Sequence, residues 1–585
     1  MLFIGLISKR FNKFLPIKIA LLKEECFQSR FNFHTRLSIG NRYAAQASGT
    51  KRDEKFSVEL FDKQVERRRQ QAQRSIVVQV QSEQSCAQLC EYCSQFGNIA
   101  SMYHYTASNS TMHFILMEFN NVETVTEVMK ACGHNDRSQI IPTYSRMLWF
   151  RAKQKKKVTS NSSKANIPLV SSAPPVTRQQ LYEWLGQTDS VSDQLKLLYE
   201  ATRLDELGVR LRFVTAHQLE VAVSGLFPRA QVLLFGSSVN GFGRRGCDLD
   251  LVLQLDQWSE EEDSKCRLMF HAKPSVNARS QTQRHIDGLA DLVQWFLPGC
   301  TDVRRILLAR VPIVKYRQEF TDVECDLSLT NMTAVYMSEL LYTLGAADWR
   351  LQPLAFTVRR WAAEVGLSNP SPGRWITNFS LTLLVIFYLQ RSRVLPSLDT
   401  LRHLAGKTDR RITEDGVNCS FLRDITQLSP SDNTSNLESL LLGFFEYYAA
   451  FDFATQGISL GTGAPIKKRD HAALYIANPL ETHLNVSQNV SLEETERLRI
   501  EFRNAAWELE SSTDGEEVDR TNEWGLLRLF KDNQLAEKTK QLEQFYSAPK
   551  RRHSSRLIVS KLFEDEQEEQ NKSKTSRSIQ KTIVR

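Results

Sequence analysis

The chain contains 585 residues, of which 41% are hydrophobic and 24% are charged, and its formal net charge at pH 7 is +8. This length predicts about three or four globular domains, and ten cysteines in a chain of this size exclude a small disulfide-stapled scaffold. No apolar run approaches the ~18–20 residues of a transmembrane helix, so we expect no membrane span, and the run SLTLLVIFYL (380–389) predicts a buried helix.

The start of the chain is basic and poor in acids. Residues 1–46 hold eight Lys or Arg and two acidic residues, interleaved with Leu, Ile and Phe. This composition is typical of a mitochondrial transit peptide, whereas the lysines and arginines interrupt the apolar core that a secretory signal requires. We therefore expect residues 1–46 to direct the protein to the mitochondrial matrix. A disordered basic tail is the alternative.

Residues 70–150 form the next predicted domain. Their apolar patterns follow the order strand, helix, strand, strand, helix, which resembles an RNA-recognition-motif-like α/β domain. The aromatic platform that would stack RNA bases is poor, with Val77, Met112 and Phe114 on the strands concerned. RNA binding and a protein–protein role both stay open. Because the weak platform leaves an apolar sheet face, we expect a homodimer formed through this domain.

The remaining domains follow from changes in composition. Residues 151–176, rich in Lys, Ser, Asn and Pro, predict a linker. Residues 190–335 predict an α+β domain in which a polar insert of about 45 residues interrupts the strands. Residues 336–530 predict a helical domain, and the charged stretch 549–585 has little to bury and predicts disorder. The expected strands of the α+β domain are VLLF (232–235), CDLDLVLQLD (247–256), VPIVKYRQ (311–318) and DVECDLSL (322–329).

Two functional patterns overlap between residues 233 and 256. Residues 241–246 (GFGRRG) match G-x-G-x-x-G, the fingerprint of a dinucleotide site, and Asp248-Leu249-Asp250 follows directly. A dinucleotide site needs its glycines to lead into a helix whose N-terminus faces the pyrophosphate. The residues after 246 instead alternate apolar with acidic and predict a strand. We therefore exclude dinucleotide binding.

The acidic pair predicts a metal site. Side chains two apart on a strand share a face, so Asp248 and Asp250 project together, and two like charges at this separation favour bound divalent cations. Asp326, on a later predicted strand, is the candidate third carboxylate. Upstream, Gly236 and Ser237 end a strand in a tight turn whose N–H groups and hydroxyl can hold phosphates.

A Gly-Ser turn, then Asp-x-Asp, then a distant strand Asp is typical of the polymerase-β-like nucleotidyltransferases. The stretch FGSSVNGFGRRGCDLDLVLQLD resembles their noncanonical poly(A) and terminal uridylyl polymerase branch, and the resemblance continues over about residues 190–510. With the targeting region and the RNA-recognition-like domain, the whole chain resembles the mitochondrial poly(A) polymerases. The resemblance implies a polymerase-β-like catalytic palm of mixed sheet and helices, followed by a helical central domain. It also implies template-independent addition of AMP from ATP to RNA 3′ ends.

By this resemblance, Asp248 and Asp250 bind two Mg²⁺ (or Mn²⁺) ions, and Asp326 helps to hold the catalytic ion near the 3′-hydroxyl of the RNA. The implied nucleotide contacts are those of the phosphates (Gly236, Ser237, Arg359 and Ser380), the ribose (Asn331) and the base (the loop from Asn478 through Glu481 to Asn485). Phe356 stands where the family has a lysine, and Leu381 stands where it has a stacking tyrosine.

The choice of nucleotide rests on the same loop. Uridylyl-selective relatives carry a histidine immediately before the position of Asn485, and here that residue is Leu484. The missing imidazole removes a donor for uracil, so ATP is the expected substrate. The alternatives are a terminal uridylyltransferase or other RNA nucleotidyltransferase and, from another class, a catalytically inactive RNA-binding scaffold. The intact carboxylates argue against the scaffold.

Overall fold

The computed structural model describes residues 59–107, 111–134, 143–152, 169–171, 176–255, 267–268, 278–329, 331–369, 371, 373–511 and 524–530. The predicted transit peptide, most of the linker and the C-terminal tail lie outside the described residues. Apart from Glu364–Gly366, the described residues belong to one compact unit. Within the described part, no helix is long and apolar enough to cross a membrane.

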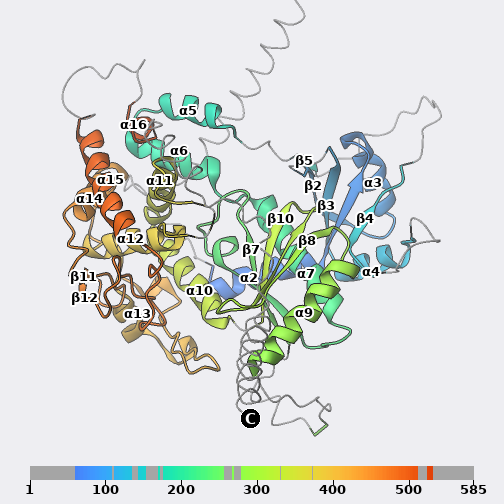
Figure 1. Cartoon of the computed structure of the whole chain (residues 1–585). Coiled ribbons are helices and arrows are strands. Elements are labelled where there is room, and N and C mark those ends of the chain that lie inside the picture. The colour runs from blue at the N-terminus through green and yellow to red at the C-terminus, as the bar shows by residue number, and fades with distance from the viewer. Residues whose placement is uncertain are drawn as a thin grey trace, which may run out of the picture. The chain divides into compact units, whose positions relative to one another are not determined.

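The N-terminal part is a five-stranded sheet with two helices on one face (Figure 1). Its elements are β1 (Ser75–Val80), α3 (Cys86–Cys93), β2 (Ile99–Thr106), β3 (His113–Phe119), α4 (Val122–Lys130), β4 (Met147–Trp149) and β5 (Leu169–Ser171). The strand order is β4-β1-β3-β2-β5. The expected order of strand, helix, strand, strand, helix is confirmed, and β4 and β5 extend the sheet at both edges.

The opposite face of this sheet is buried inside the chain. Val77 and Phe114 belong to a core cluster that also includes helix α7 (Glu206–Val223) and the second sheet. The Tyr105 hydroxyl donates a hydrogen bond of 2.7 Å to the Phe320 carbonyl oxygen, and the rings of Phe114 and Phe320 lie 5.6 Å apart. The apolar face that we expected to be available for self-association is therefore covered by the chain's own second sheet and helix.

The second sheet carries the predicted carboxylates. Its elements are β6 (Gln231–Phe235), β7 (Leu249–Gln254), α9 (Ala278–Phe296), β8 (Cys300–Ile306), β9 (Ile313–Gln318) and β10 (Val323–Ser328). The strand order is β6-β7-β10-β9-β8, with β7 and β10 parallel and the other neighbours antiparallel. Residues of α7 and α9 pack with one face of this sheet in a shared core. The residues that follow the glycines form the strand β7, as expected, and not a helix.

One expectation for this domain is wrong. The predicted polar insert contains α9 and β8, which are regular elements rather than a loop. Four apolar residues of α9 recur at helical spacing and are buried, namely Ile286, Leu289, Ala290 and Val293. Most of the other residues of the helix are polar, so its average composition hides the apolar face that packs on the sheet.

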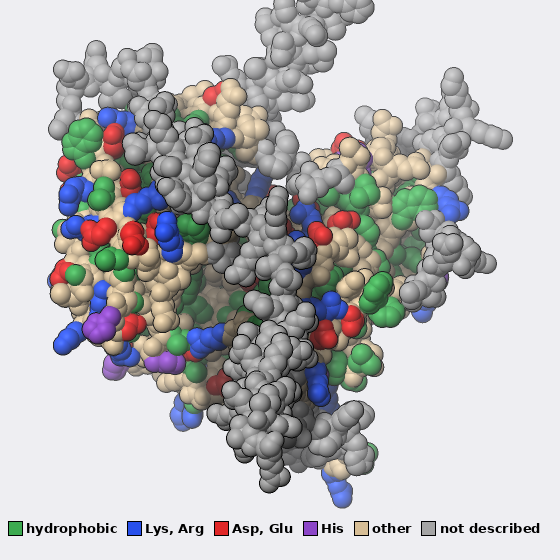
Figure 2. Space-filling view, viewed as in Figure 1, with side chains coloured by type: hydrophobic (Ala, Val, Ile, Leu, Met, Phe, Trp, Pro, Cys, Tyr) green, Lys and Arg blue, Asp and Glu red, His purple; other side chains and the backbone are tan. Residues whose placement is uncertain are grey.

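The C-terminal part is helical, as predicted. Its elements are α10 (Met332–Ala347), α11 (Leu351–Glu364), α12 (Asn378–Arg391), α13 (Leu398–Leu404), α14 (Leu437–Ala449), β11 (Gln456–Gly457), β12 (Ile466–Lys467), α15 (Leu492–Glu510) and α16 (Leu526–Leu529). Residues 380–389 lie in α12 and are all buried, so the predicted core helix is confirmed. On the side formed by α14 and α15, basic and acidic side chains are interleaved (Figure 2), so the net positive charge is not gathered there.

Three further helices complete the compact unit. They are α2 (Phe61–Gln73), α5 (Arg178–Gly186) and α6 (Val191–Thr202). Helix α2 precedes the first sheet and starts before residue 70, where we expected the N-terminal domain to begin. It packs on both α7 and α10: Arg68 forms an ion pair with Glu206, and the Phe61 and Tyr342 rings lie 5.5 Å apart. The segment that leads into the N-terminal sheet therefore contacts α7 and α10 directly.

Candidate active site

Three carboxylates lie side by side on adjoining strands of the second sheet. Asp250 on β7 pairs in register with Asp326 on β10, and Asp248 immediately precedes β7. Leu249 and Leu251, on the other side of β7, are fully buried because side chains alternate between the two faces of a strand. The structure therefore brings together the three aspartates that the sequence pattern singled out.

The surroundings of these aspartates disfavour their negative charge. Burial raises the pKa of Asp250 to about 7, and the neighbouring Asp326 and Asp248 carboxylates add to the rise. Burial also raises the pKa of Asp326, although Lys315 opposes that effect. Carboxylates that share a partly buried site repel each other unless a cation lies between them. The three aspartates Asp248, Asp250 and Asp326, called the carboxylate row below, therefore carry more negative charge than their surroundings balance.

Lys315 supplies part of the missing charge. It lies opposite Asp326 in the pairing of β9 with β10, and its Nζ is 3.2 Å from Asp326 Oδ1 and 3.5 Å from Asp248 Oδ2. Burial acts against the ammonium, but the two aspartates outweigh it and raise the pKa of Lys315. The sequence analysis did not single out this lysine. The alternation of buried Val314 and Tyr316 with Lys315 was the signal that could have placed it on the acidic face.

The donor set fits a divalent metal. Carboxylate oxygens are the ligands that Mg²⁺ and Mn²⁺ prefer, and Asp326 Oδ1 is buried without a well-directed hydrogen bond from any described residue. A single cation, the Lys315 ammonium, already lies within 3.5 Å of two of the carboxylates. As they stand, no three His, Cys, Asp or Glu side chains of the described residues are close enough to ligate one ion.

The Gly236–Ser237 turn lies directly against this row. Gly236 has a φ of +69°, and a Cβ at this position would overlap Asp250 Oδ2, so only glycine fits. The Gly236 N–H donates a hydrogen bond of 2.7 Å to Ser338 Oγ on α10. This N–H is therefore already engaged, contrary to our expectation that it would hold a phosphate. Ser237, the next residue of the turn, lines the cavity described below, where its hydroxyl can hold a phosphate.

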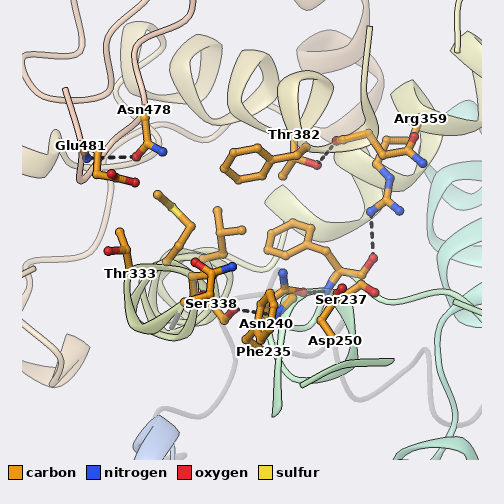
Figure 3. A pocket seen from close by; sticks show the side chains of 18 residues that line it. Phe235, Ser237, Asn240, Asp250, Thr333, Ser338, Arg359, Thr382, Asn478 and Glu481 are labelled. Carbon is orange, nitrogen blue, oxygen red and sulfur yellow. Dashed lines mark hydrogen bonds between the residues drawn. The ribbon is translucent and has the colours of Figure 1, made fainter. Parts of the chain in front are cut away.

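A cavity of about 400 Å³ opens beside the turn. Figure 3 shows Asn478 and Glu481 at one end, with Ser237 and Asp250 at the other. The cavity therefore joins the carboxylate row to the predicted base-recognition loop. Its lining residues are Phe235, Gly236, Ser237, Asn240, Phe242, Asp250, Asn331, Thr333, Ala334, Met337, Ser338, Leu341, Arg359, Asn378, Phe379, Thr382, Asn478 and Glu481.

Arg359 brings a half-buried positive charge to the cavity. Its Nη1 donates a hydrogen bond of 2.8 Å to the Phe242 carbonyl oxygen. Burial lowers the pKa of Arg359 to about 10, and the nearby Arg244 guanidinium contributes to the fall. The side chain thus stays charged at neutral pH. A guanidinium held in one orientation is suited to bind an anion.

Two of the predicted nucleotide contacts lie outside the cavity. Ser380 is fully buried, and its hydroxyl donates to the Val486 carbonyl oxygen at 3.5 Å. The Asn485 amide donates to the Leu474 carbonyl oxygen at 2.9 Å and accepts the Ile476 N–H at 3.1 Å. The structure therefore differs from the prediction for Ser380 and Asn485. Both polar groups bind backbone on either side of the recognition loop, at residues 474, 476 and 486.

Phe379 is the aromatic side chain that the sequence analysis missed. Leu381, at the expected position of the stacking ring, is fully buried in the core of α12. Phe379, two residues earlier, is half-buried and lines the cavity. Because side chains two apart on a helix point in different directions, α12 presents Phe379 to the cavity and Leu381 to the core. Phe356, at the position of the family lysine, is buried and supplies no charge.

The fold and the site define the class of the protein. A mixed sheet with a Gly-Ser turn and three strand carboxylates, joined to a helical domain that completes a nucleotide-sized cavity, is a polymerase-β-like nucleotidyltransferase. Three family models match the chain: the central palm domain of the mitochondrial-like poly(A) RNA polymerases over residues 191–346, the Cid1 family of poly(A) polymerases over 436–486, and the RL domain over 60–133.

Comparisons that cover about four fifths of the chain give the family. The mitochondrial poly(A) RNA polymerase of Drosophila melanogaster is 48% identical over 81% of this chain and 81% of its own length. The human enzyme of the same description is 35% identical over 82% of each chain. A crystal structure of mtPAP in complex with ATPγS is 31% identical, covers 81% of this chain and 99% of its own, and has a TM-score of 0.72. The chain belongs to the mitochondrial poly(A) RNA polymerase family.

Proposed function

We propose that the protein adds AMP from ATP to the 3′ ends of RNA without a template. The observation that carries this proposal is the cavity itself, which joins the carboxylate row at one end to Asn478 and Glu481 at the other. A nucleoside triphosphate bound along it would have its phosphates beside Ser237 and Asp250 and its base beside the recognition loop. Residues 190–335 would carry the catalytic strands and residues 336–530 the base-recognising helices and loop.

Asp248, Asp250 and Asp326 would hold Mg²⁺ or Mn²⁺. When bound, such ions lower the pKa of the attacking 3′-hydroxyl and neutralise charge on the triphosphate. The chain's own side chains do the positioning. The Ser237 hydroxyl and the Arg359 guanidinium hold the phosphates, while a base can stack on Phe379. Asn331, which immediately precedes α10 and lines the cavity, lies where the ribose contact is expected.

Selection of ATP rests on the residue before Asn485. Leu484 cannot donate a hydrogen bond to a uracil carbonyl, so a bound UTP would leave its polar edge without that donor. The test is extension of an RNA primer with each of the four nucleoside triphosphates supplied separately. We expect extension with ATP to be far faster than with UTP. Equal or faster incorporation of UTP would make the protein a uridylyltransferase instead.

The acceptor is proposed to be RNA that approaches over β9 and β8. Across the sheet, Asp326 pairs with Lys315, and Lys315 pairs with the exposed Arg304. From β10 across β9 to β8, the side chains paired across the sheet thus change from a carboxylate to two cations. A phosphate backbone that leads its 3′ end to Asp326 would cross these two cations, and its binding would weaken as salt rises.

We propose that the protein acts in mitochondria, in the matrix, in keeping with the basic N-terminus and with relatives that are described as mitochondrial.

Self-association through the N-terminal domain is also proposed, but by a surface other than the covered sheet face. Tyr92 and Trp149 are exposed on that domain, with 41% and 43% of their surface accessible. Sedimentation of the wild type beside a Tyr92→Ser, Trp149→Ser variant tests this, since a monomeric wild type would exclude the dimer.

A further inference from the structure

Ser338 makes a contact that ordinary helical serines do not make. It lies on α10 with 1% of its surface exposed, and its hydroxyl donates to the Ala334 carbonyl oxygen at 2.8 Å. A buried serine commonly satisfies its donor in this way. Its oxygen, however, also accepts the Gly236 N–H at 2.7 Å, from a residue that lies 102 positions earlier in the chain. The hydroxyl therefore joins the helical wall of the cavity to the sheet.

Ser338 hydrogen-bonds to Gly236, and the position of Gly236 determines how closely the turn approaches Asp250. Gly236 lies with positive φ against Asp250, so closely that a side chain would overlap the carboxylate. Its carbonyl oxygen accepts the N–H of Asn240 at 3.2 Å, which closes the turn that presents Ser237. The N–H that Ser338 holds and this carbonyl belong to the two peptides on either side of the Gly236 Cα, so a shift of Gly236 would move Ser237 and change the space available to Asp250.

Helix α10 is a fixed support for this contact. Glu339, the residue after Ser338, is 3% exposed and forms an ion pair with Arg423, which also pairs with Asp62 at the start of α2. The pocket-facing side of α10 meanwhile supplies cavity residues such as Asn331 and Met337. One helix thus lines the nucleotide cavity and, through Ser338, sets the turn that meets the phosphates.

We propose that Ser338 is a positioning residue for nucleotidyl transfer, and that its hydroxyl sets the orientation of the Gly236 peptide and so the placement of Ser237 relative to Asp250. This inference rests on the proposed function and adds a residue to its machinery. Ser338 lines the cavity, but its hydroxyl proton is donated to Ala334 and its oxygen accepts from Gly236, so the side chain has no proton left to donate to the nucleotide. Its effect passes through the backbone of the turn, so it should appear in the rate of the chemical step more than in nucleotide binding.

The test compares Ser338→Ala with Thr343→Val. Thr343 is a matched control because it lies on the same helix, is 3% exposed, and its hydroxyl bonds to the Glu339 carbonyl oxygen within that helix at 2.9 Å. We expect Ser338→Ala to lower kcat for ATP-dependent primer extension by about tenfold or more with a much smaller change in KM. Thr343→Val should keep kcat near the wild-type value, and Ser338→Cys, a weaker acceptor, should fall between the two.

Hydrogen exchange at the Gly236 amide gives a second readout that needs no catalysis. In Ser338→Ala this amide should exchange faster than in the wild type and in Thr343→Val, while amides elsewhere in α10 stay protected. A kcat for Ser338→Ala within twofold of wild type, or an equal loss in Thr343→Val, would overturn the positioning role. If the wild type did not extend RNA with ATP, the proposed function would fail, and an unchanged Gly236 exchange rate would separately refute the structural link.

Discussion

The two walls of the nucleotide cavity are built in opposite ways. On the sheet wall, Asp250 and Asp326 lie side by side with raised pKa values, and Lys315 supplies one positive charge to three carboxylates. On the helical wall, polar groups are satisfied by the protein itself: the Thr382 hydroxyl donates to the Asn378 carbonyl oxygen at 2.8 Å, and Ser338 bonds to two backbone groups. The sheet wall has the properties of a site for bound cations, and the helical wall those of a rigid support.

The largest effect is expected from the sheet wall. Asp250→Asn removes a charge that the metal site needs, so ATP-dependent RNA extension should fall by about three orders of magnitude or more. The variant should keep its fold, because the change removes an unfavourable buried charge. Circular dichroism checks the fold, and a single-turnover extension assay measures the rate. Retention of more than a tenth of the wild-type rate would show that Asp250 has no catalytic role.

An intermediate effect is expected at the outer end of the same sheet face. Arg304→Gln removes one exposed cation from the proposed RNA path, so the primer Kd should rise severalfold, and the slope of log Kd against log salt should fall by about one. Arg499→Gln, on the far helical side in an exposed pair with Glu496, is the matched control. Fluorescence anisotropy with a labelled RNA measures both. Equal behaviour of the two variants would remove β8 from the RNA path.

A smaller effect is expected where the helical wall only supports the loop. Asn485→Ala removes hydrogen bonds to the backbone of residues 474–487, so it should cost about 1–3 kcal/mol of unfolding free energy. Because Asn485 lies outside the cavity, the ratio of ATP to UTP incorporation should change less than for Glu481→Ala. Urea unfolding and the extension assay measure the two quantities. A change of base preference as large as that of Glu481→Ala would mean that Asn485 contacts the nucleotide.

A further effect concerns the stability of the metal-free protein and its dependence on pH. Asp250 has a pKa near 7 in the fold, against an ordinary value of 3.8. Folding therefore favours the protonated carboxyl, and its stabilising contribution, complete below about pH 4, is lost as pH rises through about 7. Metal-free Asp250→Asn should thus be more stable than wild type at pH 8, on the order of 1–3 kcal/mol, with the advantage disappearing towards pH 4. Thermal unfolding in the presence of chelator measures this difference in stability at each pH. Equal pH profiles for the two proteins would contradict the raised pKa of Asp250.

Alternation and spacing in the sequence predicted the parts of the site that lie on regular elements. Asp248 and Asp250 share a face because Leu249 and Leu251 must be buried, and the same rule places Asp326. The register between strands 76 residues apart, which sets Asp250 directly beside Asp326, does not follow from either strand alone. It depends on how β7 and β10 pair, which is a tertiary outcome.

Other features depended on contacts between distant segments and could not be predicted. The N-terminal sheet has the pattern of a domain with a free apolar face, but Phe114 packs on Phe320 and closes that face. Ser380 and Asn485 were expected at the nucleotide because family motifs mark them, yet their polar groups bind nearby backbone. The acceptor role of Ser338 has no sequence signal, since its partner Gly236 is brought to it only by the packing of α10 on the turn.

The most direct test of the account is RNA primer extension with ATP after chelation and during stepwise return of Mg²⁺, with the wild type beside Asp326→Asn. We predict that wild-type extension stops in chelator and returns with Mg²⁺, while Asp326→Asn stays inactive at every Mg²⁺ concentration. Extension by the wild type in chelator, or by Asp326→Asn at a rate close to that of the wild type, would contradict the assignment of the carboxylate row as the metal-dependent catalytic centre.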